Sequence, residues 1–426
     1  MSAVHRHPTS NFDHSKLFTN VAQAEAEGLE VFRVFVQVYM DAFPILSSRK
    51  NESSEAVYFS VGNWNQEELQ RLDNYFCLGH FPKGVNRHEC FRVWLSEFAV
   101  LQDGFRVTLS SGKTVFLCGG IGVGKYDMPE AQAQAGALQQ GADYPDRHSY
   151  IHRDDLDNLD YDLNENRKNL QQLRSVRARQ AADPRSNEIL TELQQIGMNP
   201  TPSALEHPSL QFDVSQQIPP QTCHSELLGI AGKALALFLH ELTPIGQGTL
   251  LDAMQNQILP PHWDMPASLR VAHTGNLQCG VEDIRRNMQL LPFAIYDLLS
   301  LPPKTSTLVS KLESRLKFTA EALEKYRARK HNKPRSQGTE DLFTAFVAMA
   351  WSLKHTQARC RRSGSPSADR ASLGELASAV FAGRKAVHAN WPGEFNIPNF
   401  VTGRHYASAT ELYGVPAALS LSAWRK

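Results

Sequence analysis

Short runs of β-branched and aromatic residues characterise the first third of the chain. The apolar residues of 30–40 are almost continuous and stop at Asp41, which is typical of a central strand with a carboxylate at its C-terminal end. Two shorter runs of the same kind follow at 56–61 and 74–79, with turn-forming residues between them. Three strands in succession predict a meander.

A helix and a hairpin follow the predicted meander. Large apolar residues recur at helical spacing over 88–102, which predicts an amphipathic helix. The segments 105–109 and 114–119 flank turn residues and predict a β-hairpin whose second strand is buried. The pattern of 30–130 is therefore that of an α/β core.

The hydrophobic pattern changes after residue 130. Gln, Asp, Asn and Arg dominate 131–222, where aromatic residues are few, so we predict exposed helices and loops there rather than core. From 225 to 242 the spacing becomes apolar and helical, and Pro244 ends it. Helical spacing returns at 281–300, 305–330, 340–360 and 370–388. The second half is predicted to be mostly α-helical.

Composition narrows the classes of function. The chain has 44 Lys and Arg against 44 Asp and Glu, so its formal charge of zero provides no overall attraction to nucleic acid. Local basic segments at 167–185, 325–335 and 354–362 fit phosphate contacts or, more commonly, a solvated helix face. The six cysteines are too far apart for a Cys-x-x-Cys pair, which predicts reduced thiols. No long apolar run or apolar leader is present, which predicts an intracellular protein without a membrane partner.

Residues 119–125 follow a predicted strand and match the phosphate-binding pattern G-x-x-x-x-G-K. In such a loop the backbone N–H groups around Gly119 and Gly124 would surround phosphates, and Lys125 would reach the outer ones. The next position normally carries Ser or Thr as a Mg²⁺ ligand, but here it is Tyr126. A nucleotide-binding protein is therefore one alternative, and an ordinary glycine-rich strand exit is the simpler one.

Two aspartates, Asp41 and Asp127, each follow shortly after a predicted buried strand. If the two strands are neighbours in one sheet, the carboxylates can hold one or two Mg²⁺ or Mn²⁺ ions, which activate water and stabilise the leaving oxygen in phosphodiester cleavage. Aspartates at such places are more commonly turn formers or helix caps. On residue spacing alone, both interpretations stand.

The order of several short motifs adds a family resemblance. They lie at 38–43, 56–61, 78–84, 126–130 (Tyr-Asp-Met-Pro-Glu), 159–163, 224–230 and 398–414. In this order they resemble the core of transposases encoded by fungal DNA transposons. The similarity is greatest to the Plavaka-type group of the Kyakuja–Dileera–Zisupton class, which is related to the CACTA elements, and it covers about 30–415.

This resemblance implies a fold, a chemistry and partners. The fold is α/β, with an RNase-H-like mixed sheet in the N-terminal part and a large, mostly α-helical insertion and C-terminal region. Asp41 matches the first acidic position of the family and Asp127 the second, where they bind Mg²⁺ or Mn²⁺ for DNA strand cleavage and transfer. The implied partners are transposon DNA ends and further copies of the chain, and the implied location is the nucleus.

The resemblance also implies an organisation for the whole chain. It consists of a polar N-terminal tail (1–29), the sheet core (30–130), a polar knuckle and linker region (131–222), the helical insertion (223–395) and a shortened return to the core (396–426). His224 and Glu226 match a family motif and are possible accessory residues, although an acid in a first helical turn is more commonly there for the helix dipole. A third acidic ligand is implied beyond the insertion, and the sequence does not identify it.

Departures from the family pattern predict that function has been lost. Family members carry a Cys-x-x-Cys zinc knuckle after the second aspartate, but the corresponding positions here are Asp146 and Ser149. Thiolate ligands are therefore absent, and Asp146, His148 and His152 offer only an improvised substitute. The sequence also ends soon after its Tyr-Gly motif at 413–414. We expect a degenerate transposase without activity, and a non-enzymatic DNA-binding or protein-interaction remnant is the alternative.

Overall fold

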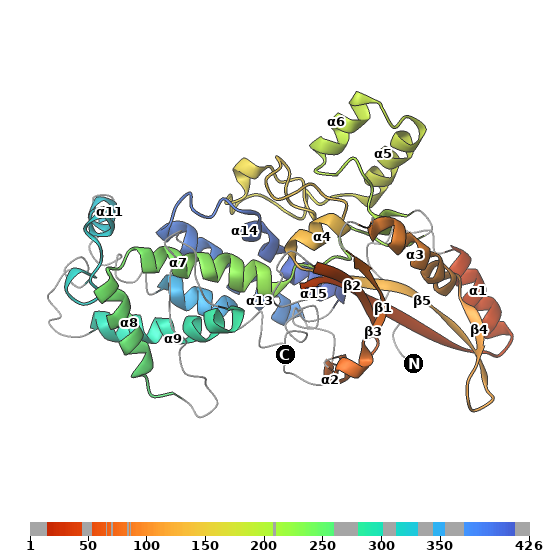
Figure 1. Ribbon diagram of the computed structural model, residues 1–426, viewed down its shortest axis with the longest axis horizontal. Helices are drawn as coiled ribbons and strands as arrows, with labels where there is room; N and C mark the ends of the chain where they lie inside the picture. The colour runs from red at the N-terminus through yellow and green to blue at the C-terminus, as the bar shows by residue number, and fades with distance from the viewer. Residues whose placement is uncertain are drawn as a thin grey trace.

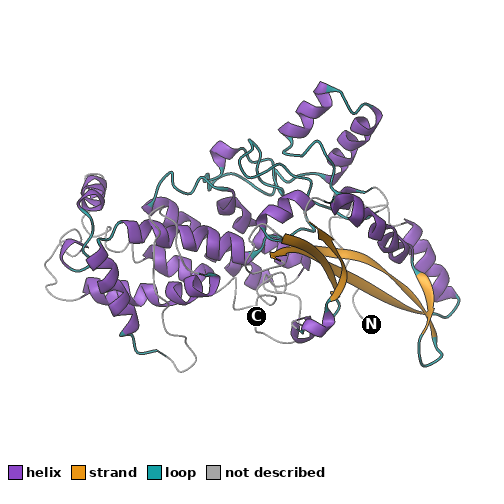
Figure 2. Cartoon of the chain, viewed as in Figure 1, coloured by secondary structure: helices purple, strands orange, loops and turns teal. Residues whose placement is uncertain are grey.

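The computed structural model is a mixed α/β protein with a curled five-stranded sheet at one end and a helical bundle at the other (Figure 1, Figure 2). The residues it describes are 15–44, 53–64, 66–69, 71–82, 85, 87–207, 210–259, 280–300, 312–330, 344–353 and 370–413. Every strand of these residues lies before residue 126, and helices make up most of the second half. The predicted α/β class is therefore confirmed.

The sheet has its strands in the order β3-β2-β1-β5-β4. Their bounds are Glu30–Pro44 for β1, Ser53–Val61 for β2, Phe76–Pro82 for β3, Phe105–Thr108 for β4 and Thr114–Lys125 for β5. β1 pairs antiparallel with β2, β2 with β3 and β4 with β5, which confirms both the predicted meander and the predicted hairpin. β1 and β5 run parallel. Because β1 is third in the strand order, it is the central strand of the sheet.

Strand β5 is longer than the sequence predicts. The glycine-rich sequence suggests that the strand ends at Gly119, whereas β5 continues beside β1 to Lys125. Pairing with β1 and burial of Ile121 and Val123 outweigh the low strand propensity of glycine. Gly119 is required at its position because a side chain there would overlap the backbone carbonyl of Val34 in β1.

Substituting Gly119 by alanine should destabilise the protein by about 1–3 kcal/mol, because the added Cβ meets fixed backbone rather than a movable side chain. Gly141 provides the matched control, since a Cβ at that position has no neighbouring atom within 4 Å. Urea titration gives the free energy of unfolding of both variants. Equal stability of Gly119→Ala and Gly141→Ala would contradict the close approach of β1 and β5.

Two helices, α1 (Ser15–Ala26) and α3 (Arg87–Asp103), pack along the sheet, and a short helix, α2 (Gln66–Leu69), connects β2 to β3 (Figure 1). α3 confirms the predicted amphipathic helix. α1 corrects the expectation of a polar tail for residues 15–26, because its Val21 and Ala24 pack against buried residues of β5, while residues 1–14 lie outside the described residues. These two residues lie three positions apart, which places them on one face of the helix.

The polar region 131–222 contains less exposed surface than its composition predicts. Its helices are α4 (Met128–Gln134), α5 (Leu170–Ala182) and α6 (Asn187–Gln195), and Figure 1 shows α5 and α6 projecting from the body. The loops between and after them, however, enter the core of the sheet half with buried apolar residues: Leu210, Phe212, Val214 and Ile218.

Internal hydrogen bonds explain why polar residues of these loops are buried. Gln217 donates through Nε2 to the carbonyl groups of Ile121 and Gly122, on the side of β5 that β4 covers only as far as Leu117. The Gln217 carbonyl accepts in turn from the Gly124 amide. Buried polar groups that are paired in this way carry little penalty, so the expectation of an exposed region is wrong for this segment.

The helical half begins with the π-helical segment η4 (Cys223–Ala231), which continues directly into α7 (Gly232–His240). The further helices are α8 (Pro244–Gln255), α9 (Val281–Ser300), α11 (Ala320–Lys330), the helix at 344–353, α13 (Arg370–Asn390), α14 (Pro398–Thr402) and α15 (Tyr406–Tyr413). They enclose a core that contains Phe238, Phe346 and Trp391. The predicted helical second half is confirmed for the described residues, and none of their helices has the length and apolar character needed to cross a membrane.

Candidate functional site at the sheet edge and the buried junction

The parallel strands β1 and β5 bring Asp41 and Asp127 to one edge of the sheet. Tyr39 of β1 is in register with Lys125 of β5, so each aspartate follows two positions after this pair. The backbone of Asp41 also pairs with Ala56 of β2, while its side chain lies outside the described residues. Asp41 therefore lies inside β1, which continues to Pro44, rather than at the strand end that the sequence predicts. We call the C-terminal parts of β1 and β5, with these two aspartates, the sheet edge.

Asp127 is the N-cap of helix α4. Its Oδ1 accepts a hydrogen bond from the Glu130 amide at 2.9 Å, so the helix-cap interpretation of this residue is confirmed. The residue is half-buried, and the structure shows no partner for its second oxygen, Oδ2, among the described residues. The cap uses one carboxylate oxygen, which leaves the other for a hard cation such as Mg²⁺.

Residues 119–125 form a strand rather than a loop. The backbone of Gly119 and Gly124 pairs with β1, and the Gly124 amide donates to the Gln217 carbonyl, so these groups are not arranged around a phosphate. Lys125 is only 5% exposed, and burial lowers its pKa to about 7. The phosphate-loop hypothesis therefore lacks both the loop and the accessible lysine that it requires.

A buried ion pair joins η4 to α13. The carboxylate of Glu226 accepts from both terminal nitrogens of Arg384, at 2.8 Å from Nη1 to Oε2, and the two side chains are 3% and 1% exposed. The Arg384 Nε donates to the Phe400 carbonyl at 3.0 Å. Glu226 stands in the first turn of its helix as predicted, but its partner is an arginine rather than the helix dipole alone.

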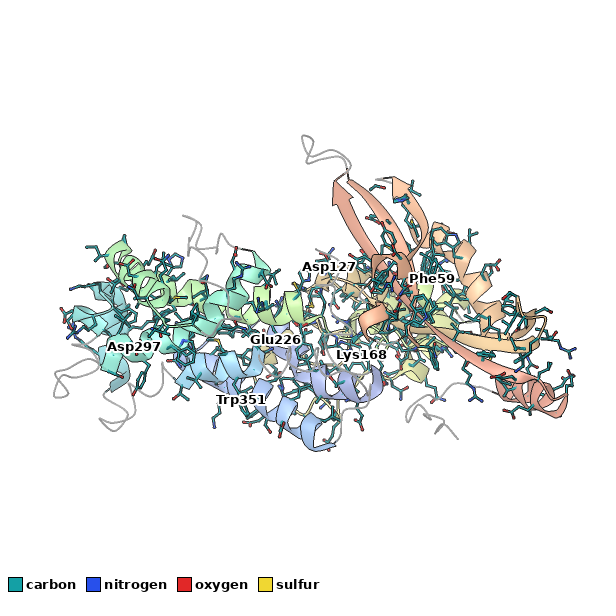
Figure 3. The ribbon with its side chains drawn as sticks, turned by 90° about the horizontal axis from the view of Figure 1, so that it is seen from below. Phe59, Asp127, Lys168, Glu226, Asp297 and Trp351 are labelled. Carbon is teal, nitrogen blue, oxygen red and sulfur yellow. The ribbon has the colours of Figure 1, made fainter. Side chains whose placement is uncertain are left out.

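The possible accessory residue His224 is bound locally. Its Nδ1 is hydrogen bonded to the side chain of Gln221, and its carbonyl accepts from Asn399 Nδ2 at 3.3 Å. Figure 3 shows the neighbouring Glu226 between the sheet half and the helical half, away from Asp127. The structure therefore does not bring His224 and Glu226 to the sheet edge, and places them in a separate buried cluster.

Consecutive residues of the C-terminal segment bind separate parts of the chain. Arg404 donates to three carbonyl groups in the loop 158–161. His405 binds the carboxylate of Asp146, and Tyr406 is hydrogen bonded to Ser225 of η4. We call this arrangement the junction, and its members are Asp146, Ser149, Ser225, Glu226, Arg384, Arg404, His405 and Tyr406.

Asp146 is the centre of one half of the junction. Its Oδ2 accepts from Ser149 Oγ at 2.6 Å and from His405 Nε2 at 2.9 Å. Burial by itself would raise the pKa of Asp146, but the charge and hydrogen bond of His405 outweigh it and hold that pKa well below its usual range. Asp146 is therefore ionised at neutral pH.

His148 lies next to this carboxylate without binding it. Its Nδ1 donates to the Ser215 carbonyl at 2.6 Å, its ring centroid is 4.7 Å from that of His405, and its Nε2 has no partner among the described residues. Burial lowers the pKa of His148 well below its ordinary value, so the ring is neutral. His152 instead caps a short helix at Arg153–Asp155, so the improvised site is not assembled.

The sequence provides little indication of the junction. Arg384 is a charged residue inside an apolar helical pattern, which is a signal of a buried partner, but nothing in the sequence points to Glu226 as that partner. Within the described ranges, no three His, Cys, Asp or Glu side chains form a group that could hold a metal ion. Comparison with protein-family models and with curated proteins finds no match to this chain.

Proposed function

We propose that this protein derives from a DNA transposase and that its sheet edge is the remnant of a divalent-metal centre for DNA strand cleavage. The observation that carries the proposal is the parallel pairing of β1, which contains Asp41 near its C-terminal end, with β5, which Asp127 follows. An RNase-H-like core is supported by the order of the elements: an antiparallel meander, then α3, then the hairpin of β4 and β5, whose second strand runs parallel to β1.

The chemistry of the donors fits Mg²⁺ or Mn²⁺. Both ions prefer carboxylate oxygens, and Asp127 retains an oxygen beside its cap hydrogen bond. Asp41 and Asp127 would hold the ion, which when bound supplies an activated water and neutralises charge on a phosphodiester. Because the third acid of the family is not identified and the knuckle cysteines are replaced, we propose that the sheet edge binds metal without cleaving DNA.

The basic segment 167–185 supports DNA contact less than its charge suggests. Three of its arginines are occupied within the protein: Arg174 donates to the Leu210 carbonyl, Arg177 pairs with Glu206 and Arg179 pairs with Glu192. The other basic segments, 325–335 and 354–362, lie partly or wholly outside the described residues. DNA as a partner therefore depends on the family resemblance and on the sheet edge.

Titration of the full chain with Mn²⁺ by calorimetry tests the proposal. The wild type should bind, and Asp41→Asn and Asp127→Asn should each weaken binding at least about tenfold, which corresponds to about 1.4 kcal/mol for one lost charged ligand. Asparagine caps a helix as well as aspartate does, so Asp127→Asn removes the charge and keeps the start of α4. Glu97→Gln, an exposed acid on α3, is the control and should bind as the wild type does.

Nicking of supercoiled plasmid in Mn²⁺ tests the loss of cleavage. We expect the wild type and Asp127→Asn to give the same background. Cleavage by the wild type alone would show an active enzyme. No Mn²⁺ binding by the wild type, or equal binding by wild type and Asp127→Asn, would contradict the metal site and leave the non-enzymatic remnant as the function.

A further inference from the structure

The residues at the implied zinc knuckle do not fit a zinc ion. Structural zinc is bound by four ligands, almost always thiolates and imidazoles, whereas positions 146 and 149 carry a carboxylate and a hydroxyl. The two side chains are hydrogen bonded to each other, because Ser149 Oγ donates to Asp146 Oδ2. The third group, His405 Nε2, is directed at the same carboxylate oxygen.

The polarity of this arrangement is opposite to that of a metal site. A zinc ion attracts lone pairs, so a histidine ligand presents a bare nitrogen to it. Here the central atom is an anionic oxygen, and His405 presents an N–H to it, as Ser149 presents an O–H. One implied zinc position, Asp146, thus supplies the central atom, and the other, Ser149, donates to it together with His405.

Positive charge beside the cluster favours an anion at its centre. Arg147 and Lys168 are both buried next to Asp146, and burial lowers their pKa to about 10 and about 8. Two buried cations would repel a divalent ion, whereas they stabilise the carboxylate. Within the part of the chain that the structure describes, the Lys168 ammonium donates one hydrogen bond, a long one of 3.5 Å to the Gly197 carbonyl, and Asp146 is the charge that acts on it.

We infer that the Asp146 carboxylate replaces a bridging metal ion at this junction. Hydrogen bonds from Ser149 and His405 to one carboxylate oxygen hold the 146–149 segment to the C-terminal segment, and the two halves of the protein are joined without zinc. The inference depends on the implied zinc positions and not on the sheet edge, so the Mn²⁺ titration and the experiments below can fail independently.

Thermal unfolding of the wild-type full chain tests the inference directly. The Tm is expected to be the same after treatment with a zinc chelator, with added ZnCl₂ and with neither, because no metal contributes to the junction. Asp146→Asn should lower the Tm equally in all three conditions. A chelator-induced fall in the wild-type Tm that zinc reverses, and that His405→Gln eliminates, would overturn the inference.

A gain of zinc binding provides a second, independent readout. The double variant Asp146→Cys/Ser149→Cys restores acceptor atoms at both positions, with His405 and the unpartnered Nε2 of His148 as two further ligands. We expect it to bind a single zinc ion per chain, with a zinc-dependent rise in Tm and a thiolate-to-cobalt absorption band after substitution by Co²⁺. Refolding with and without zinc gives the same readout if the variant needs the metal to fold.

Two control variants make this second test specific. Ser149→Cys alone should bind no zinc, because His405 stays hydrogen bonded to the Asp146 carboxylate, which leaves one thiolate and the His148 imidazole as ligands. His405→Ala added to the double cysteine variant should abolish the binding. A folded double variant with no more zinc than the wild type would overturn the inference, because positions 146, 149 and 405 would then not converge on an ion-sized centre.

Discussion

Arg384→Met is expected to lower the free energy of unfolding by about 3–5 kcal/mol, the effect of leaving a buried carboxylate without its partner. Glu226 is 3% exposed and receives two hydrogen bonds from Arg384, so water cannot replace them without opening the junction. Gly403 packs directly against this ion pair, because a Cβ at that position would overlap both Arg384 and Glu226. Urea unfolding at neutral pH measures the loss.

The double variant Glu226→Leu/Arg384→Met separates the ion pair from simple packing. Removing both charges should recover most of the stability, since apolar replacement of a buried ion pair is often neutral. Recovery should remain incomplete because Arg384 also donates to the Phe400 carbonyl, which would lose its partner. The control is Glu282 on α9, an exposed acid that pairs with the half-buried Arg285, and Glu282→Ala should change stability by less than about 0.5 kcal/mol. A similar small effect of Arg384→Met would contradict the buried geometry.

Lys125→Met is expected to stabilise the protein at and below neutral pH. The ammonium of Lys125 is buried at the end of β5, and the structure shows no ion pair for it among the described residues. The fall in its pKa from 10.5 to about 7 corresponds to at most ~5 kcal/mol of penalty on the charged form. Methionine fills a similar volume without the charge, so the stability should rise by a few kcal/mol at about pH 6.

The sign of the pH dependence follows from the lowered pKa. Between about pH 7 and the ordinary value of 10.5, the unfolded chain retains a proton that the folded chain releases, so wild-type stability rises with pH across this window. Below about pH 7 both states bind the proton and the full penalty is present. Lys125→Met should reduce the rise to the part that comes from Lys168, whose pKa burial also lowers, whereas Lys113→Met, at an exposed position before β5, should leave the rise unchanged. Parallel stability curves for wild type and Lys125→Met from about pH 6 to pH 9 would contradict the buried charge.

The hydrophobic period predicts the elements that pack by one clear face. α3 is found close to its expected bounds because its apolar side meets another element. β1 begins where expected, but pairing with β2 carries it past Asp41 to Pro44. The extension of β5 beyond Gly119 could not be predicted, because it depends on the carbonyl of Val34 approaching a residue without a side chain. Burial of the loop around Gln217 could not be predicted from the sequence either, because its hydrogen bonds go to a strand about 95 positions earlier.

The candidate site divides in the same way. Asp127 could be placed at a strand end and recognised as a possible cap from local sequence alone, and the structure confirms the cap. The partner of Glu226 could not be found, because 158 positions separate it from Arg384 and no local pattern links them. The assignment of 146–149 to a knuckle identified the right segment for a junction, but not the histidine that completes it.

The contacts of residues 404–406 also determine the order in which the protein can assemble. His405 meets Asp146 across 259 positions, Arg404 meets Asn158 across 246 and Tyr406 meets Ser225 across 181. Closing such long loops is entropically unfavourable, so these contacts form after local ones. During synthesis each half can collapse around its own apolar residues as it leaves the ribosome. These contacts must wait until residues 404–406 are translated, so a nascent chain stalled before residue 404 would hold two folded parts that lack them.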